Sequence, residues 1–210
     1  MISAPARIAV IDYGIGNLAS AQKAFAHLGV DAFLTSDATE IANADGVVLP
    51  GVGHFGACMR ELRSAGLEAV ATASALDTRP FLGICVGMQM LFDGSDEAPD
   101  VAGLGIVPGR VRSLPSTVKL PQIGWNTIET KPNSLMFHGL GDEPWLYFVH
   151  TYAAFAADDR DVGAWCEYGT RFACAVERPH LWATQFHPEK SAAPGLKLLS
   201  NFAAQCGAER

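Results

Sequence analysis

A cysteine between two glycines marks the segment of the chain whose residues are best suited to chemistry. The sequence from Phe81 to Gln89 reads FLGICVGMQ, so Cys85 stands in a G-x-C-x-G pattern between a predicted strand and a predicted helix. This is the cysteine counterpart of the nucleophile elbow, a strained turn at which β-carbons two residues away would crowd the crossing from strand to helix. Backbone N–H groups at the start of such a helix lower the pKa of a thiol and bind an oxyanion. Cys85 is therefore a candidate nucleophile, and the alternative is a small buried residue, as most free cysteines are.

A candidate base follows another predicted strand. The apolar run 182–186 leads directly into His187, Pro188 and Glu189. Residues two apart share one face of an extended chain, so the imidazole and the carboxylate are expected to point the same way. A base oriented by a carboxylate is what a cysteine nucleophile requires. An H-x-E pattern is common on protein surfaces, and it is the conjunction with Cys85 that indicates a catalytic pair.

A glycine-rich turn is a candidate for the rest of an oxyanion hole. Residues 49–53 (LPGVG) follow a predicted strand, and neighbouring parallel strands end at one edge of a sheet, so this turn can lie beside Cys85. Its N–H groups would then act together with the N–H of Val86. The alternatives are a connective or phosphate-binding loop, although the Lys-Ser/Thr pair of a Walker motif is missing. The segment 12–17 fits only two glycines of a dinucleotide fingerprint, and that interpretation is set aside.

Strands and helices must position these groups. In the first half, short apolar runs alternate with amphipathic segments, which predicts right-handed βαβ units and a mainly parallel sheet. Buried strands are predicted at 7–11, 31–34, 46–49 and 80–84. Three helices are predicted in this half. The first follows Asn17, which can cap it, the second contains Phe55, Met59 and Leu62, and the third runs from about 86 to 92.

The second half has a different pattern. Short apolar runs separated by turn residues predict antiparallel strands, added to the same sheet or packed beside it, at 105–111, 122–128, 145–149, 171–176 and 181–186. A closing helix is predicted at 191–205, with Leu196, Leu199 and Phe202 facing inward. Because the sequence shows neither a repeat nor a low-complexity linker, residues 1–210 are expected to form one α/β domain.

Composition excludes several classes of function. Of the 210 residues, 49% are hydrophobic and 18% charged, and the net charge is -7 with scattered basic residues, which argues against a nucleic-acid surface. Neither a spanning run of about 20 apolar residues nor a leader pattern at 1–7 is visible, so no membrane is expected as a partner. Five widely spaced cysteines without a C-x-x-C pair favour a reducing compartment, the cytoplasm.

Neither a metal nor a cofactor is expected. Cys85, His187 and Glu189 are conceivable ligands, but no second cysteine at ligand spacing and no H-x-x-x-H pattern completes such a set. His150, in FVHTY, is placed at the end of a predicted strand, where it either lines the site or serves as a structural histidine.

Three motifs together resemble the triad-type, or class I, glutamine amidotransferases, and the resemblance covers nearly the whole chain. They are PGVGHFG at 50–56, LGICVGMQ at 82–89 and QFHPEKS at 185–191. Within that family the glutaminase subunits of imidazole glycerol phosphate synthases, in histidine biosynthesis, are similar in DYGIGNL at 12–18, IGWN at 123–126 and FVHTY at 148–152. Val86 stands where leucine is usual and Thr151 where serine is usual, and neither departure removes a catalytic group.

The resemblance implies a flavodoxin-like α/β fold, with a mainly parallel central sheet to which antiparallel strands are added. It implies a triad of Cys85, His187 and Glu189 that hydrolyses glutamine through a glutamyl thioester. The implied oxyanion hole consists of backbone N–H groups of Val52, Gly53 and Val86. The residues implied in binding the substrate are Gly51, Gln89, His150, Thr151 and Tyr152.

The resemblance also implies a partner, a (β/α)₈-barrel cyclase that receives the ammonia. Because the sequence stops at residue 210, the cyclase is expected on a second chain, in a heterodimer. The interface is expected to include Asn17, Trp125, Asn126, Tyr152 and Lys190. Three alternatives remain open: a glutaminase subunit of another synthase, such as anthranilate or aminodeoxychorismate synthase, a non-catalytic interaction subunit, and a cysteine hydrolase that cuts a peptide or γ-glutamyl bond.

Overall fold

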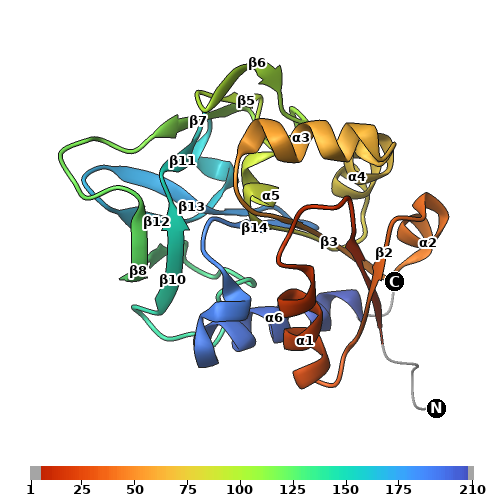
Figure 1. Cartoon of the computed structure of the whole chain (residues 1–210). Helices are drawn as coiled ribbons and strands as arrows, with labels where there is room; N and C mark the ends of the chain where they lie inside the picture. The colour runs from red at the N-terminus through yellow and green to blue at the C-terminus, as the bar shows by residue number, and fades with distance from the viewer. Residues whose placement is uncertain (1–5, 208–210) are drawn as a thin grey trace.

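The first half of the chain builds four of the five strands in the parallel part of a 12-stranded mixed sheet, and β14 from the second half adds the fifth (Figure 1). The computed structural model describes residues 6–207. Both ends of the domain expected at 1–210 therefore lie outside the described residues, and so does most of the segment 1–7, in which no leader pattern is visible. The parallel strands are ordered β2-β1-β3-β4-β14, which is the 2-1-3-4-5 order of flavodoxin-like folds and confirms that prediction. They are β1 (Arg7–Ile11), β2 (Asp31–Thr35), β3 (Gly46–Gly51), β4 (Phe81–Cys85) and β14 (Leu181–Thr184).

Helices cover both faces of these strands. Helices α1 (Leu18–His27) and α6 (Ala192–Cys206) lie on one face, and α3 (Phe55–Ser64), α4 (Glu68–Leu76) and the short α5 (Val86–Gln89) lie on the other, while α2 (Ala38–Asn43) packs against α4 and β1. Because both faces are covered, every residue of β3 and β4 is buried, in accordance with their continuous apolar sequences. Within residues 6–207, none of the helices is long and apolar enough to cross a lipid bilayer.

Apart from β14, most strands that follow β4 in the chain extend the sheet with mainly antiparallel pairs. From β14 the sheet continues through β13, β11 and β7 to β5 and β6, and β12 pairs with both β13 and β9. The bounds are β5 (Gly94–Ser95), β6 (Ala98–Ala102), β7 (Gly109–Ser113), β9 (Glu129–Thr130), β11 (Tyr152–Ala156), β12 (Val162–Glu167) and β13 (Arg171–Glu177). A 3-10 turn, η1 (Asp159–Asp161), precedes β12.

Two strands form a separate antiparallel sheet, which we call the β8–β10 ribbon. It consists of β8 (Gln122–Thr127) and β10 (Trp145–His150), and its register places Trp125 opposite Tyr147 and Gly124 opposite Phe148. Leu146 and Phe148 are fully buried. Because side chains alternate across a strand, Trp125 and Tyr147 lie on the opposite, outer face.

Three local predictions differ from the structure. The segment 181–186, predicted among the antiparallel strands, forms β14, which ends at Thr184 and pairs parallel to β4, although it is antiparallel to β13. The helix expected at about 86–92 ends at Gln89, because the N–H groups of Leu91 and Phe92 bond to the carbonyl groups of Met88 and Gln89, three residues back, instead of four. Asn17 occupies the N-cap position of α1 but makes no side-chain cap bond. Its amide is instead directed to the site described next.

Candidate active site

Three neighbouring parallel strands bring the site together at their carboxyl ends. Strand β3 ends at Gly51 and β4 at Cys85, and His187 follows β14 by three residues. The register places Gly51 opposite Cys85 and Thr184 opposite Ile84, so these strand ends lie side by side. Open α/β sheets bind their ligands at this edge. The separate sequence motifs therefore meet in one place.

Cys85 lies on a strained turn, as its flanking glycines predict. Its φ of 56° and ψ of -113° belong to a region that residues with side chains rarely adopt. A β-carbon at Gly87 would lie 1.9 Å from the carbonyl oxygen of Leu49, and one at Gly83 would lie 3.0 Å from the carbonyl oxygen of Gly87. The backbone of β3 therefore requires glycine at position 87, and the backbone of α5 favours glycine at position 83.

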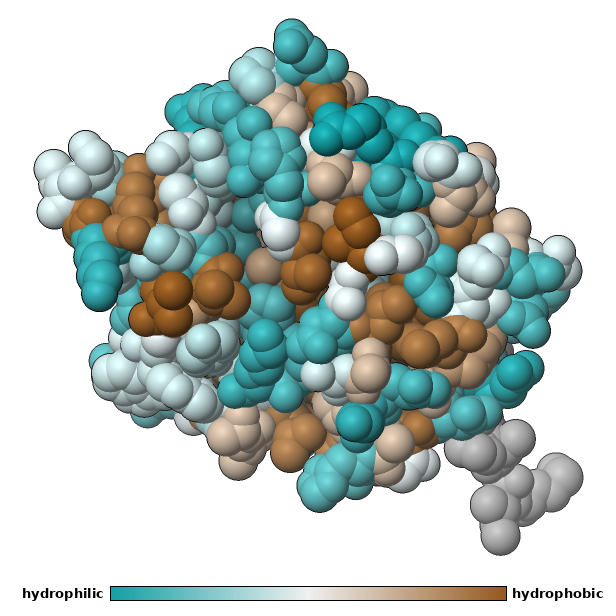
Figure 2. All heavy atoms as spheres, in the orientation of Figure 1, coloured by the Kyte–Doolittle hydropathy of each residue, from teal (hydrophilic) through white to brown (hydrophobic). Residues whose placement is uncertain are grey.

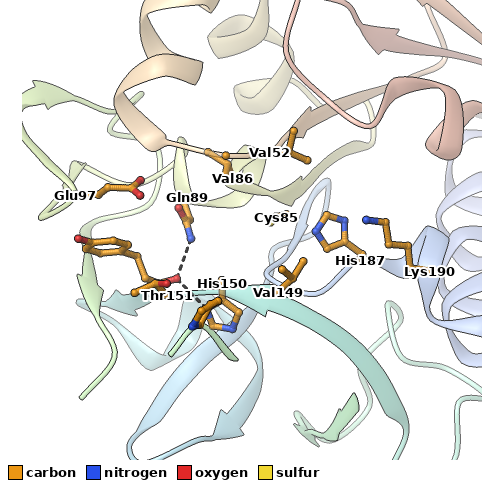
Figure 3. Close-up of a pocket in the computed structure, with 13 residues that line it drawn as sticks. Val52, Cys85, Val86, Gln89, Glu97, Val149, His150, Thr151, His187 and Lys190 are labelled. Carbon is orange, nitrogen blue, oxygen red and sulfur yellow. Dashed lines mark hydrogen bonds between the residues drawn. The ribbon is translucent and has the colours of Figure 1, made fainter. Parts of the chain in front are cut away.

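The carboxylate of Glu189 holds the imidazole of His187. The Nδ1 atom of His187 lies 2.8 Å from Glu189 Oε1, and both side chains are 2% exposed. The two residues meet through a 3-10 turn, η2 (Pro188–Lys190), rather than along an extended strand. Asn17 Nδ2 donates to the same Oε1 over 3.5 Å, whereas Oε2 has no hydrogen-bond partner among the described residues. Glu189 thus fixes the ring and leaves Nε2 for Cys85, beside which Figure 3 shows the imidazole.

The charges of the three side chains depend on one another. Burial opposes the imidazolium form of His187, but hydrogen bonds and charge interactions with Cys85 and Glu189 raise the pKa of His187 to about 9. The imidazole therefore carries a proton at neutral pH. An imidazolium beside a cysteine stabilises the thiolate, which is the nucleophilic form. In the described part of the chain, no three His, Cys, Asp or Glu side chains are arranged to hold a metal ion.

A cavity of about 350 Å³ opens over Cys85 (Figure 3). Most residues expected to bind substrate or to form the oxyanion hole line it, namely Val52, Gly53, Val86, Gln89, His150, Thr151 and Tyr152. Gly51 does not line this cavity and lies behind the triad, in a small void that it shares with Asn17 and Glu189. The structure thus places seven of these eight residues on the wall of the cavity, and Gly51 beside Cys85 but outside the cavity.

Two side chains of the site are not among the candidate residues that the sequence predicts. Gln185 is fully buried, accepts a hydrogen bond from Gln89 over 3.0 Å and places its Nε2 atom 3.8 Å from Cys85 Sγ. Glu97 lines the cavity, and its Oε2 atom accepts the N–H of Phe55 over 2.7 Å. The position of Gln185 two residues before His187 was an available signal. Glu97 comes from the turn between β5 and β6, where no local pattern marks it.

Two further side chains hold the glycine-rich turn. The hydroxyl of Tyr13 donates to the carbonyl oxygen of Pro50 over 2.7 Å, and the thiol of Cys58 donates to that of Val52 over 3.3 Å. Gly53 has a φ of 82°, which favours glycine. Because the C=O and N–H of one trans peptide point in opposite directions, the N–H of Gly53 points away from Cys58.

His150 is a neutral histidine at the wall of the cavity. Its Nδ1 atom lies 2.9 Å from the carbonyl oxygen of Tyr152. Burial lowers the pKa of His150 to about 4, although the Tyr152 carbonyl opposes this effect. Nδ1 therefore carries the ring proton, and Nε2 is a buried acceptor that lacks a partner within residues 6–207.

The residues expected at a partner interface fall in different places. Tyr152 and Lys190 line the cavity and Asn17 lies behind the triad, as described above. The Nδ2 atom of Asn126 donates to the carbonyl oxygen of Glu167 over 3.1 Å, so this side chain ties the ribbon to β12 and does not join its outer face. Trp125 is 47% exposed on that outer face and is therefore not a core residue.

The outer face of the β8–β10 ribbon is apolar and exposed. Besides Trp125 it carries Ile123, 63% exposed, and Trp145, 57% exposed. The rings of Trp125 and Tyr147 pack edge to face with centroids 6.0 Å apart. Figure 2 shows apolar side chains at the surface on the side of the molecule where β8 and β10 lie. Exposed apolar patches of this kind are typical of protein interfaces.

Comparison with known proteins identifies relatives along almost the whole chain. The family model of class-I glutamine amidotransferases, "Glutamine amidotransferase class-I", matches residues 9–206. The imidazole glycerol phosphate synthase subunit HisH of Dechloromonas aromatica (strain RCB) is 47% identical over 206 residues, which cover 93% of this chain and 94% of that protein. The subunit of the same name from Methanothermobacter thermautotrophicus is 46% identical, over 93% of this chain and 96% of that protein.

Solved structures share the fold at lower sequence identity. A structure described as a glutamine amidotransferase superposes with a TM-score of 0.74 at 18% identity and covers 96% of this chain and 99% of its own. A chain in the structure of PurLQS from Thermotoga maritima gives a TM-score of 0.74 at 18% identity, over 95% of this chain and 98% of that one.

Proposed function

This chain belongs to the class-I glutamine amidotransferases, and we propose that it hydrolyses glutamine to glutamate and ammonia. The observation that carries the proposal is the buried His187–Glu189 pair, 2.8 Å apart, next to a cysteine on a strained elbow. In this assignment Cys85 is the nucleophile, His187 is the acid and base, and Glu189 orients the imidazole.

The first half of the reaction forms a thioester. The Cys85 thiolate attacks the side-chain amide carbon of glutamine, and its carbonyl oxygen becomes an oxyanion. The N–H groups of Val86 and of the turn residues Val52 and Gly53 stabilise that oxyanion, by about 3 kcal/mol for each well-placed donor. When the tetrahedral intermediate collapses, the C–N bond breaks and His187 gives its proton to the departing nitrogen, which leaves as ammonia.

The second half of the reaction restores the enzyme. His187, now neutral, accepts a proton from water as the water oxygen attacks the thioester carbon. The C–S bond then breaks, glutamate leaves, and the Cys85 thiolate returns beside a protonated His187. The imidazole pKa of about 9 matches this cycle, because it keeps the proton on His187 at neutral pH when the thiolate is present.

The cavity suits the rest of a glutamine molecule. Glu97 provides a carboxylate on its wall, and only Oε2 of that carboxylate is engaged by the N–H of Phe55. A carboxylate at this place is suited to the α-ammonium group of an amino acid. His150 Nε2 is a neutral acceptor, and Gln89 holds the backbone of Tyr152 in position through a bond of 2.9 Å. We assign these residues, with Thr151, to substrate binding.

The names of the relatives support a proposal for the use of the ammonia. Proteins named imidazole glycerol phosphate synthase subunit HisH are 44% to 47% identical over at least 93% of this chain. We therefore assign the same role, the glutaminase subunit of that synthase in histidine biosynthesis, acting in the cytoplasm. Its ammonia passes to a separate barrel cyclase, which forms imidazole glycerol phosphate and aminoimidazole carboxamide ribotide.

We place the cyclase on the β8–β10 ribbon and the mouth of the cavity. Trp125 with its exposed apolar neighbours supplies contact area, and Lys190 at the mouth is suited to a carboxylate of the partner. We propose that in the free chain the turn at 50–53 rests with its N–H groups turned away from Cys85. Docking of the cyclase with its substrate favours the productive turn, because the two states differ in their contacts with the partner.

The test is to measure glutamate release by the free chain, by the chain with cyclase, and by the complex with the cyclase substrate. The proposal predicts low activity alone and strong stimulation in the complex, with a glutamyl adduct on Cys85 detectable by mass spectrometry. Stimulation by anthranilate or aminodeoxychorismate synthase partners instead would assign the chain to another synthase. Absence of glutamate release under every condition would favour a non-catalytic subunit, and cleavage of γ-glutamyl peptides without a partner would favour a hydrolase.

A further inference from the structure

A closed ring of hydrogen bonds joins the β8–β10 ribbon to the triad histidine. The N–H of His187 donates to the carbonyl oxygen of Tyr147 over 3.0 Å. The N–H of Tyr147 donates to the hydroxyl of Ser191 over 2.9 Å. That hydroxyl in turn donates to the carbonyl oxygen of His187 over 2.6 Å. Backbone groups on both sides of His187 are thus tied to one residue of β10, with a single side chain closing the ring.

The hydroxyl of Ser191 is used in an unusual way for its position. Ser191 is the N-cap residue of α6, where a serine side chain ordinarily accepts an N–H from the first helical turn. Here it makes no cap bond, and it serves the ring instead. Ser191 is fully buried and does not line the cavity over Cys85. Its hydroxyl therefore acts on His187 and on Tyr147, and touches neither solvent nor substrate.

The other member of the ring belongs to the exposed surface. Tyr147 packs its ring against Trp125, with centroids 6.0 Å apart, on the outer apolar face of the ribbon. A partner seated on this face contacts side chains whose backbone is bonded directly to His187. A displacement of β10 therefore moves the backbone from which the imidazole projects.

We propose that Ser191 is a positioning residue that couples the seating of the cyclase on the β8–β10 ribbon to the alignment of His187 with Cys85. The inference rests on the proposed function and adds to it the route by which the partner acts on the base. The ring makes two bonds to Tyr147, so it fixes both the position and the orientation of the His187 backbone relative to β10. The direct His187–Tyr147 bond alone would leave the His187 peptide free to rotate. Misplacement of a catalytic group by about 1 Å costs on the order of a hundredfold in rate, so a small adjustment of this kind is sufficient.

The test compares Ser191→Ala with Ser134→Ala in glutamate release, for the free chain and at saturating cyclase. Ser134 is the matched control, because its hydroxyl also accepts a backbone N–H, from Phe137, and donates to an acceptor, Glu177, but makes no contact with His187 or Tyr147 among these bonds and does not line the cavity over Cys85. Ser191→Ala is expected to lower the stimulation ratio at least about tenfold, through kcat rather than KM, with parent-like cyclase affinity. Ser134→Ala is expected to keep the ratio. An unchanged ratio in Ser191→Ala, or the same loss in both variants, would overturn the proposal.

A double-mutant cycle tests whether Trp125 and Ser191 contribute to the same coupling between the cyclase and His187. Trp125→Ala and Ser191→Ala act on one coupling in this account, so the combined variant at saturating cyclase should lose little more stimulation than the more affected single variant. Fully independent losses would show that Ser191 acts on His187 without the ribbon, which contradicts the proposal.

Hydrogen exchange of the free chain provides a readout that needs no partner and no activity. Ser191→Ala is expected to speed amide exchange at least about tenfold in peptides that contain Tyr147 and in peptides that contain His187, and Ser134→Ala in neither. Parent-like exchange at His187 in a folded Ser191→Ala chain would refute the ring. If the parent chain shows no stimulation by the cyclase, the proposed function fails, and the exchange result still decides whether Ser191 holds His187.

Discussion

Replacing Glu189 by glutamine removes the negative charge next to His187 and keeps a side chain of the same shape. The contact to Nδ1 is 2.8 Å long and both side chains are 2% exposed, so solvent screens it little. Hydrogen bonds to charged groups contribute about 1.5 to 3 kcal/mol. Because 1.36 kcal/mol corresponds to a tenfold change in rate, kcat for glutamine hydrolysis in the complex is expected to fall about ten- to hundredfold.

The same substitution is expected to move the pH profile. Burial disfavours the imidazolium, and Cys85 with Glu189 nevertheless raises the pKa of His187 to about 9. Since His187 must carry a proton to release ammonia, activity is expected to fall as pH rises through about 9. Without the carboxylate, fewer interactions oppose the effect of burial on the imidazolium. The pKa of His187 therefore falls, and the alkaline limb of the pH profile moves to lower pH. The stabilisation of the fold by this proton is likewise complete below the ordinary pKa of 6.5 and lost as pH rises through about 9.

The assay is steady-state glutamate release at saturating cyclase between about pH 6 and pH 10. His187→Ala is the comparison, expected to abolish turnover, and Asn17→Ala is the control, because its bond to the same carboxylate oxygen is 3.5 Å long and contributes little. Equal, small effects of Glu189→Gln and His187→Ala would refute the assignment of the base. An unmoved alkaline limb in Glu189→Gln would refute the assigned effect of the carboxylate on the imidazole.

Gly87→Ala is expected to lower the midpoint of thermal unfolding by about 6 °C or more. The added β-carbon would lie 1.9 Å from the carbonyl oxygen of Leu49, and overpacking of this kind costs about 1–3 kcal/mol or more. A midpoint within about 2 °C of the parent in scanning calorimetry would contradict the crowding. Trp125→Ala is expected to weaken cyclase binding about 30-fold in calorimetric titration, whereas Leu76→Ala, at a position 66% exposed on α4, serves as the control. Equal affinities of these two variants would remove the ribbon from the interface. Glu97→Gln is expected to raise KM for glutamine about tenfold, since it removes a charge from the cavity wall, and a parent-like KM would show that the substrate ammonium binds elsewhere.

The parallel half of the fold and its nucleophile are readable from sequence because their causes are local. Continuous apolar strands reflect burial on both faces. The two glycines around Cys85 reflect contacts within one strand-turn-helix unit and with the adjacent β3. The early end of α5 is less readable, because the segment after Gln89 pairs with residues distant in sequence, Leu104 and Ile106, whose N–H groups bond to Met90 and Leu91.

Contacts between distant segments explain what the sequence does not reveal of the site. Glu97 reaches the cavity through the short pair β5 and β6, and no spacing relates it to Cys85. Asn17 has the residue type and position of a helix cap, yet its amide is directed to Glu189, 172 residues away. The ribbon strands are recognisable individually, but their separation from the main sheet depends on pairing that local patterns do not encode.

The central claim is that ammonia is made at Cys85 and used elsewhere. The most direct measurement is synthesis of imidazole glycerol phosphate by the reconstituted complex that carries Cys85→Ala, with either glutamine or an ammonium salt as nitrogen source. The account predicts that glutamine-dependent synthesis is abolished and ammonium-dependent synthesis is retained, because free ammonia bypasses the thioester. Retained glutamine turnover in the alanine variant, or loss of both activities in an intact complex, would contradict it.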